Sequence, residues 1–217
     1  MFLILWGVQM KNQTGLRWVL TILAVILNAL GVAFITRAAL GTVPATSIPN
    51  VLAIVYDRFT IGGYLFVLSI IQIVLQVILL KKDFHMFQLL QIVPSLVLSY
   101  FVDFFMSFLK DLPVSHYPLQ LLWLLVGTVI LSFSIALEVK VDLIYLPLDG
   151  LNKAIAQKTG KSFDLIKTIT DCTMVAIALI IILAVKHGLY GVREGTIISA
   201  LIAGYIVKWF SKLLNRA

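Results

Sequence analysis

The sequence predicts an all-α membrane protein whose six transmembrane helices form two inverted three-helix repeats. Of its 217 residues, 61% are hydrophobic and 12% are charged, whereas soluble domains have about 45–50% and about 25%. Six apolar stretches are long enough to cross a hydrocarbon core of about 30 Å, which takes about 20 residues. Segments of the first half also recur weakly in the second half at a nearly constant separation.

The six predicted spans differ in how many charges they contain. Three are free of charge, at residues 18–36, 59–80 and 117–137. The other three are 86–109 with Asp103, 165–185 with Lys167 and Asp171, and 195–214 with two lysines near its end. Lysines near the end of a span can extend to the membrane surface. Residues 1–9 are apolar but too short to span, and they lack the basic region of a signal peptide. We therefore interpret residues 1–15 as an N-terminal leader or interfacial segment.

The basic residues predict how the chain is oriented. With six spans, twelve of the 17 Lys and Arg residues fall on the side that holds both termini, and five fall on the other side. Loops rich in Lys and Arg stay in the cytoplasm. We expect a multi-pass protein of the cell membrane with both termini in the cytoplasm. The positive charge is explained by the lipid bilayer, so no nucleic-acid partner is expected.

A repeat relates the two halves of the chain. The stretch "AFITRAALGTVPAT" (33–46) aligns with "ALEVKVDLIYLPLD" (136–149) at an offset of 103, and "SYFVDFF" (99–105) aligns with "GYIVKWF" (204–210) at an offset of 105. The repeats are predicted at residues 16–112 and 113–217. Because each contains three spans, the second copy enters the membrane in the opposite direction, as in many secondary transporters.

Each repeat is predicted to hold a short half-helix after its first span. The stretch "ALGTVPATSIPNV" (39–51) has two prolines and no charge. Its helix would be capped by Thr46 or Ser47, and its counterpart would be capped by Asp149 and end before Gly160. Ten residues rise about 15 Å, half of the membrane. Two interpretations remain open: re-entrant helices that enclose a polar chamber, or amphipathic helices that lie at the interface and join spans.

Charged residues within the spans are candidates for function or for structural ion pairs. Arg37 and Asp103 should lie at similar depth toward the outer face, where we expect them to pair. Asp171 is within i,i+4 reach of Lys167. Alternatively, Asp171 binds a proton or a sodium ion with oxygen atoms from Thr168, Thr170 and Thr173.

Four stretches resemble a known family. They are "LGTVPATSIPNVL", "FTIGG", "YFVDFF" and "LPLDGLNKAIAQKTGKSFDLIKTITD", and together they are similar to the YczE/YyaS/YitT family of bacterial polytopic membrane proteins. The resemblance extends from about Leu16 to the end of the chain. It departs from the family pattern at Ala45 and Thr46, where tryptophan and aspartate are usual. The family has no settled biochemical activity, so the resemblance implies the architecture and leaves the substrate open.

These features predict a secondary transporter that binds a small polar or anionic solute between inverted repeats near the membrane midplane. The predicted solute-binding residues are Arg37, Thr46, Ser47, Asn50, Gln91, Asp149 and Asn152, and the predicted ion-coupling residues are Asp103 and Asp171. The alternatives are a substrate-binding subunit of a multi-component importer and a non-transporting accessory or scaffold protein. A homodimer or a partner subunit is possible under each alternative.

No enzymatic activity is expected. The three histidines fall in loops, without cysteines or carboxylates at metal-ligand spacing. We therefore expect no catalytic residue, no metal site and no cofactor. The single cysteine, Cys172, excludes a disulfide within the chain.

Overall fold

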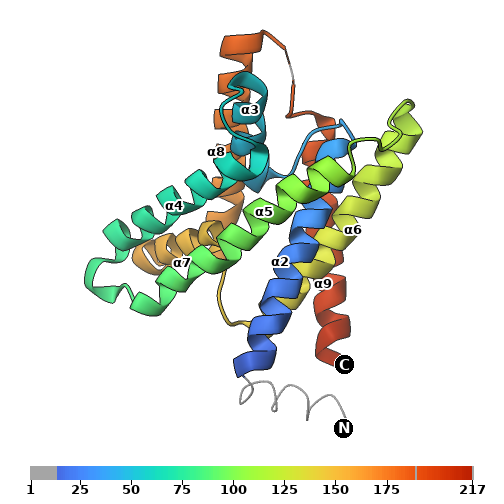
Figure 1. The fold of residues 1–217 in the computed structure, drawn as a ribbon. Helices are drawn as coiled ribbons and strands as arrows, with labels where there is room; N and C mark the ends of the chain where they lie inside the picture. The colour runs from blue at the N-terminus through green and yellow to red at the C-terminus, as the bar shows by residue number, and fades with distance from the viewer. Residues whose placement is uncertain (1–13, 189, 217) are drawn as a thin grey trace.

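The structure, a computed structural model, describes residues 14–188 and 190–216 (Figure 1). Six of its helices are long and apolar enough to cross a membrane. They are α2 (Thr14–Arg37), α4 (Ile61–Leu80), α5 (Ile92–Phe108, preceded by the 3-10 helix η3, Met86–Gln91), α6 (Tyr117–Val141), α8 (Phe163–Lys186) and α9 (Glu194–Arg216). All six predicted spans are confirmed as helices, and the chain is a multi-pass membrane protein. The predicted leader lies outside the described residues, except for Thr14 and Gly15, which begin α2.

In each half, one short helical segment follows the first long helix. In the first half, η1 (Pro44–Thr46) leads directly into α3 (Ser47–Val55), and in the second half the short helix is α7 (Pro147–Thr159). A proline opens each of these segments because its fixed φ suits the first turn of a helix. Gly160 ends α7 with a φ of 67°, the left-handed conformation that glycine adopts without strain. Both predicted half-helices are confirmed as short helices.

The order of elements is the same in both halves. Equivalent helix starts are separated by 103, 103, 102 and 102 positions, for the pairs Thr14 and Tyr117, Pro44 and Pro147, Ile61 and Phe163, Ile92 and Glu194. The packing pattern also recurs: α2 contacts α5 as α6 contacts α9, and each short helix contacts a long helix of the other half, α3 with α8 and α7 with α4. The inverted repeat itself stays a prediction that this order favours.

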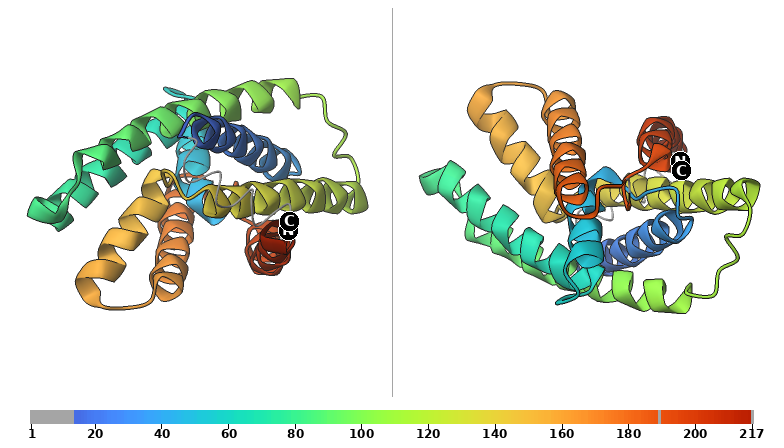
Figure 2. Two further views of the ribbon diagram at one scale, coloured as in Figure 1. Left: turned by 90° about the horizontal axis from the view of Figure 1, so that it is seen from below. Right: turned by 90° about the horizontal axis from the view of Figure 1, so that it is seen from above.

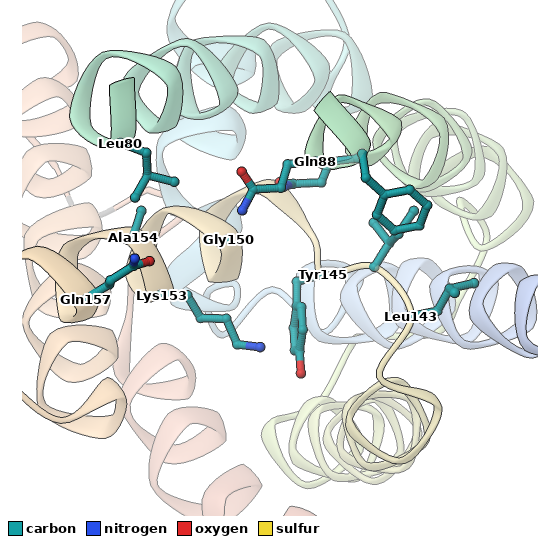
Figure 3. A pocket seen from close by; sticks show the side chains of 11 residues that line it. Leu80, Gln88, Leu143, Tyr145, Gly150, Lys153, Ala154 and Gln157 are labelled. Carbon is teal, nitrogen blue, oxygen red and sulfur yellow. The ribbon is translucent and has the colours of Figure 1, made fainter. Parts of the chain in front are cut away.

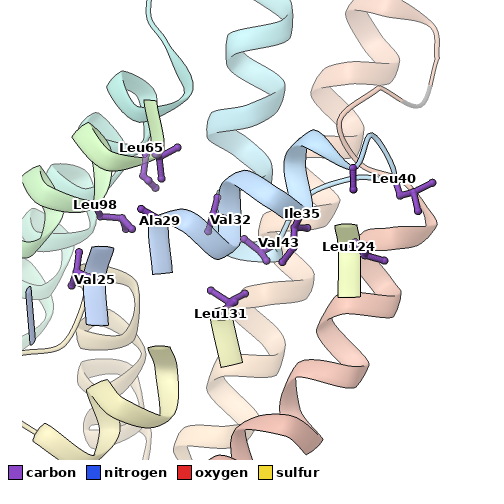
Figure 4. Close-up of a cluster of buried hydrophobic side chains, with 12 residues drawn as sticks. Val25, Ala29, Val32, Ile35, Leu40, Val43, Leu65, Leu98, Leu124 and Leu131 are labelled. Carbon is purple, nitrogen blue, oxygen red and sulfur yellow. The ribbon is translucent and has the colours of Figure 1, made fainter. Parts of the chain in front are cut away.

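The core lies where α2 crosses α6. Buried side chains of α2, α5 and α6 form one apolar cluster (Figure 4), which includes Val25, Val32, Leu98 and Leu131. The two helix backbones approach closely because glycine stands at the crossing on both sides. A Cβ atom at Gly31 would lie 2.8 Å from the amide nitrogen of Leu131, and one at Gly127 would lie 2.8 Å from the carbonyl oxygen of Gly31.

The last two helices break the similarity between the halves. α4 and α5 pack against each other, whereas α9 packs against α6 and is set apart from α8 (Figure 2). Below, the terminal face is the side where α2 begins and α9 ends, and the distal face is the opposite side, where α2 ends and α9 begins (Figure 1).

Candidate functional site at the amino terminus of α7

The amino terminus of α7 is held by side chains from three other helices. The helix begins at Pro147, three residues before the start that a cap at Asp149 would give, so Asp149 lies in its first turn and the prediction that Asp149 caps the helix is wrong. The cap position is occupied by Leu146, whose N–H donates to a carboxylate oxygen of Glu138 at 3.1 Å. A carboxylate in the first turn is still favourable, because the helix dipole is positive there.

Asp149 belongs to a cluster of charged side chains. Lys167 Nζ on α8 lies 3.0 Å from Asp149 Oδ1 and 4.0 Å from Asp171 Oδ2. The expected contact between Lys167 and Asp171 is confirmed, but the shorter contact is to Asp149, which lies 18 positions earlier in the chain. All three side chains are about two-thirds buried. Helix α8 thus supplies the counter-charge that fixes α7.

The alternative prediction was that threonine oxygens and Asp171 bind a cation. The described residues do not form such a site. The hydroxyl groups of Thr168, Thr170 and Thr173 each donate to the carbonyl oxygen four positions earlier in their own helix. Thr168 and Thr173 are also exposed. The neighbour that the structure gives Asp171 is the ammonium group of Lys167.

Glu138 is a functional candidate that sequence reasoning missed. Its side chain lies in the last turn of α6, and the residue is only 7% exposed. Among the described residues it forms no ion pair, and its hydrogen bond to Leu146 N–H is its polar contact. The predicted span stopped at residue 137, so this carboxylate was assigned to a loop. The signal that could have found it is a single acidic residue at the end of an otherwise uncharged span.

A pair of buried amides joins α7 to the first half of the chain. Gln76 on α4 and Gln91 at the end of η3 exchange hydrogen bonds, with both nitrogen-to-oxygen distances 3.1 Å. Gln76 Nε2 also donates to the carbonyl oxygen of Pro147 at 3.0 Å. Gly150 permits this approach, since a Cβ atom there would lie 2.8 Å from the Oε1 atoms of both glutamines. The predicted site residue Gln91 is therefore beside α7.

Asn152 is the most deeply buried polar side chain of α7. Its exposed fraction is 0%, and neither Nδ2 nor Oδ1 has a hydrogen-bond partner among the described residues. A buried amide without a partner costs about 1–3 kcal/mol, so native proteins rarely keep one without a use. Both the donor and the acceptor of the Asn152 amide are therefore unused by the described residues.

A cavity of about 200 Å³ adjoins this site at the terminal face (Figure 3). It lies between α7, the turn from α4 to α5 and the segment that follows α6. Lys153 extends across the cavity with its Nζ 3.2 Å from the centre of the Tyr145 ring. Burial lowers the pKa of the Lys153 ammonium group, and burial together with a hydrogen bond to Asp142 raises the pKa of the Tyr145 hydroxyl group.

The predicted site residues of the first half take part in internal hydrogen bonds. Thr46 bonds the hydroxyl oxygen of Thr42 at 3.0 Å, Ser47 donates to Pro44, and Asn50 donates to the carbonyl oxygen of Gly191 at 3.1 Å. All three predicted residues are buried, and none lines either cavity described here. Their role in solute binding stays a prediction.

Arg37 and Asp103 line a second cavity, of about 410 Å³, at the distal face. The prediction that they pair is wrong within the described residues. Arg37 donates to the carbonyl oxygen of Met106, while Asp103 accepts hydrogen bonds from the Thr60 hydroxyl at 2.6 Å and from Gly62 N–H at 2.8 Å. Asp103 is held by the amino terminus of α4, where backbone N–H groups favour a carboxylate.

The predicted site residues therefore separate into three places. Gln91, Asp149, Asn152 and Asp171 gather around the amino terminus of α7; Thr46, Ser47 and Asn50 lie around α3; and Arg37 and Asp103 lie at the distal face. The two cavities adjoin opposite ends of α4. The charged cluster, the amide pair, the buried Asn152 and the smaller cavity all meet at α7.

Comparisons with known proteins give one family. A family described as "Family of unknown function (DUF6198)" matches residues 15–212. No curated protein matches the chain, and no solved structure does. The resemblance to the YczE/YyaS/YitT family gains no support from this match and stays an expectation. Since the match covers nearly all of the sequence, the chain belongs to the DUF6198 family.

Proposed function

We propose that this protein is a proton-coupled secondary transporter of a small polar or anionic solute, which it binds between its two halves beside the amino terminus of α7. The observation that carries the proposal is a buried carboxylate, Glu138, which forms no ion pair among the described residues and accepts from Leu146 N–H at the start of α7. Two further carboxylates, Asp149 and Asp171, share the ammonium group of Lys167 beside the same helix end. Charges buried without partners are expensive within a membrane and mark ion and substrate pathways.

A proton fits this cluster better than a metal ion. The position between Asp149 and Asp171 is already occupied by Lys167 Nζ. In the described residues, the carboxylates do not gather into a group that could hold a metal ion. A proton needs no such shell, because one carboxylate without an ion pair, such as Glu138, is enough to bind it.

The position of the cluster suits coupling to a solute. Asp171 is the ninth residue of α8, about 12 Å along the helix axis, which approaches the middle of a core of about 30 Å. The amides of Gln76 and Gln91 belong to the first half, and α7 to the second. A solute bound here would contact both halves, which is the arrangement that inverted-repeat transporters use. We place the chain in the cell membrane with its terminal face in the cytoplasm, on the basis of its Lys and Arg distribution.

The test is solute-dependent proton movement in liposomes. Purified protein is reconstituted with a pH-sensitive dye inside the vesicles, a pH gradient is imposed, and pools of small metabolites are added. At least one pool should cause proton flux with the wild type. Glu138→Gln should abolish this flux, because its amide oxygen still accepts from Leu146 N–H but takes up no proton. Asp164→Asn, at an exposed carboxylate of the first turn of α8, is the matched control and should behave as the wild type.

Two results would contradict the proposal. One is equal solute-dependent flux in the wild type and Glu138→Gln. The other is the absence of flux with every pool from the wild-type protein, when reconstitution has left its thermal midpoint unchanged.

The alternative of an importer subunit has one observation in its favour. α9 packs against α6 and leaves large side chains exposed along its length, among them Leu201, Tyr205 and Trp209. A partner subunit could cover this face. Copurification of a stoichiometric ATPase module with the untreated membrane protein would favour this alternative over transport by the chain alone.

A further inference from the structure

We propose that the 200 Å³ cavity beside α7 binds a small organic anion, a carboxylate or a phosphate monoester, with Lys153 as its charge partner. This inference rests on the proposed function, because it names the substrate class of the same site. Its support comes from the charge, the polarity and the size of the cavity.

Lys153 is a cation at the cavity wall that no carboxylate contacts within the described residues. It forms none of the ion pairs within residues 14–188 and 190–216. Its Nζ lies 3.2 Å from the centre of the Tyr145 ring, a cation–π contact that positions the ammonium group without neutralising it. Burial lowers the pKa of this ammonium group, and an anion beside it would reverse that effect.

The two carboxylates nearest to Lys153 are both engaged elsewhere. Asp142 accepts the hydrogen bond of the Tyr145 hydroxyl group, and Asp149 is paired with Lys167. Both stabilise the ammonium form of Lys153 at a distance. The cavity wall therefore presents an ammonium group that no carboxylate of the described residues contacts directly, so the carboxylate or phosphate group of a ligand can take that place.

The rest of the lining fits a small amphiphilic molecule. Gln88 and Gln157 present amide groups that donate to carboxylate or phosphate oxygens, while Leu80, Phe87 and Leu143 supply apolar surface for the body of the ligand (Figure 3). A volume of about 200 Å³ corresponds to about seven water molecules at roughly 30 Å³ each. That space suits a molecule of metabolite size.

Anionic lipid headgroups also carry phosphate or carboxylate groups. The experiment therefore distinguishes a soluble anion from a lipid headgroup. Binding of benzoate, and of its neutral analogue benzamide, is measured on the full chain in nanodiscs of phosphatidylcholine alone and of phosphatidylcholine with phosphatidylglycerol. The variants are Lys153→Gln, Lys153→Arg, and Lys161→Gln as a matched control, at an exposed lysine just after α7 that does not line the cavity. Folding of each variant is checked by its thermal midpoint.

We expect saturable millimolar or tighter benzoate binding, weakened roughly tenfold or more by Lys153→Gln, which corresponds to about 1.4 kcal/mol. Lys153→Arg should retain most of the affinity, Lys161→Gln all of it, and benzamide should bind weakly to every variant. The inference is overturned if benzoate and benzamide bind equally, if Lys153→Gln and Lys161→Gln behave alike, or if no saturable benzoate binding occurs. It is also overturned if Lys153 affects only the retention of phosphatidylglycerol, which would make the cavity a lipid site.

This measurement is an equilibrium one and needs no transport. Benzoate binding that depends on Lys153, together with absent proton flux, would refute the transporter and leave the anion site standing. Proton flux that occurs with solutes but does not depend on Lys153 would refute the anion site and leave the transporter standing.

Discussion

The short helices α3 and α7 occupy equivalent places in the two halves, but the polar groups around them are satisfied in different ways. Residues 38–55 contain no charge, and the hydroxyl and amide side chains of this segment bond to one another, to its main chain and to the carbonyl oxygen of Gly191. α7 instead meets a carboxylate-rich cluster, a buried amide without a partner among the described residues, and a cavity.

The difference shows that a break in a membrane helix is not by itself a site. Neutral groups that bond one another can be buried at little cost, since each interhelical hydrogen bond in a membrane contributes about 0.6 kcal/mol on average. Charged groups carry a desolvation cost that a neutral scaffold avoids. We therefore infer that the first half provides a rigid frame around α3, and that the second half carries the chemistry around α7.

The largest effect should come from Lys167→Met. This change leaves Asp149 and Asp171 without their shared counter-charge, so proton flux should be lost and the free energy of unfolding should fall by about 2 kcal/mol, allowing for the partial exposure of the pair. Lys161→Met is the control. A midpoint equal to that of the control would contradict the role given to Lys167.

A smaller effect should come from Gln76→Leu. This change removes three hydrogen bonds, two to Gln91 and one to the carbonyl oxygen of Pro147, and frees the amino terminus of α7. At about 0.6 kcal/mol for each bond, the loss of stability is about 1–2 kcal/mol, and solute-dependent flux should fall several-fold without being abolished. Gln72→Leu replaces a buried glutamine one turn earlier that makes no side-chain hydrogen bond among the described residues. If the two variants transport equally, the amide pair does not position α7.

The fold was largely predictable because its signals are local. Span length, prolines at 44 and 147, and Gly160 each act within one turn of helix, and the six spans and both short helices follow from them. Asp149, Asn152 and Asp171 were each predicted as site residues, and the structure brings Asp149 and Asp171 to the same ammonium group, that of Lys167.

The partners of the charged groups were not predictable in the same way. Whether Arg37 meets Asp103 depends on how α2 and α5 are rotated about their axes, and the structure turns Arg37 to Met106 and Asp103 to Thr60 instead. Glu138 was missed because α6 continues four residues beyond the predicted end of its span, which brings a carboxylate from an assumed loop onto the helix. Periodicity and composition predict how far along its helix a residue lies, but they do not predict which neighbouring residue its side chain will face.

The smallest effect should come from Thr46→Val, which tests the first half. The substitution keeps the shape of the side chain and removes the hydroxyl group that bonds Thr42 and the carbonyl oxygen of Val43. We expect a loss of about 1 kcal/mol, at about 0.6 kcal/mol for each of the two bonds, measured as a slightly lower thermal midpoint with unchanged solute-dependent flux. An isosteric change isolates the hydroxyl because the buried volume stays constant. Loss of flux with an intact midpoint would show that the hydroxyl groups around α3 contact the solute, and the division of roles between the two halves would then be wrong.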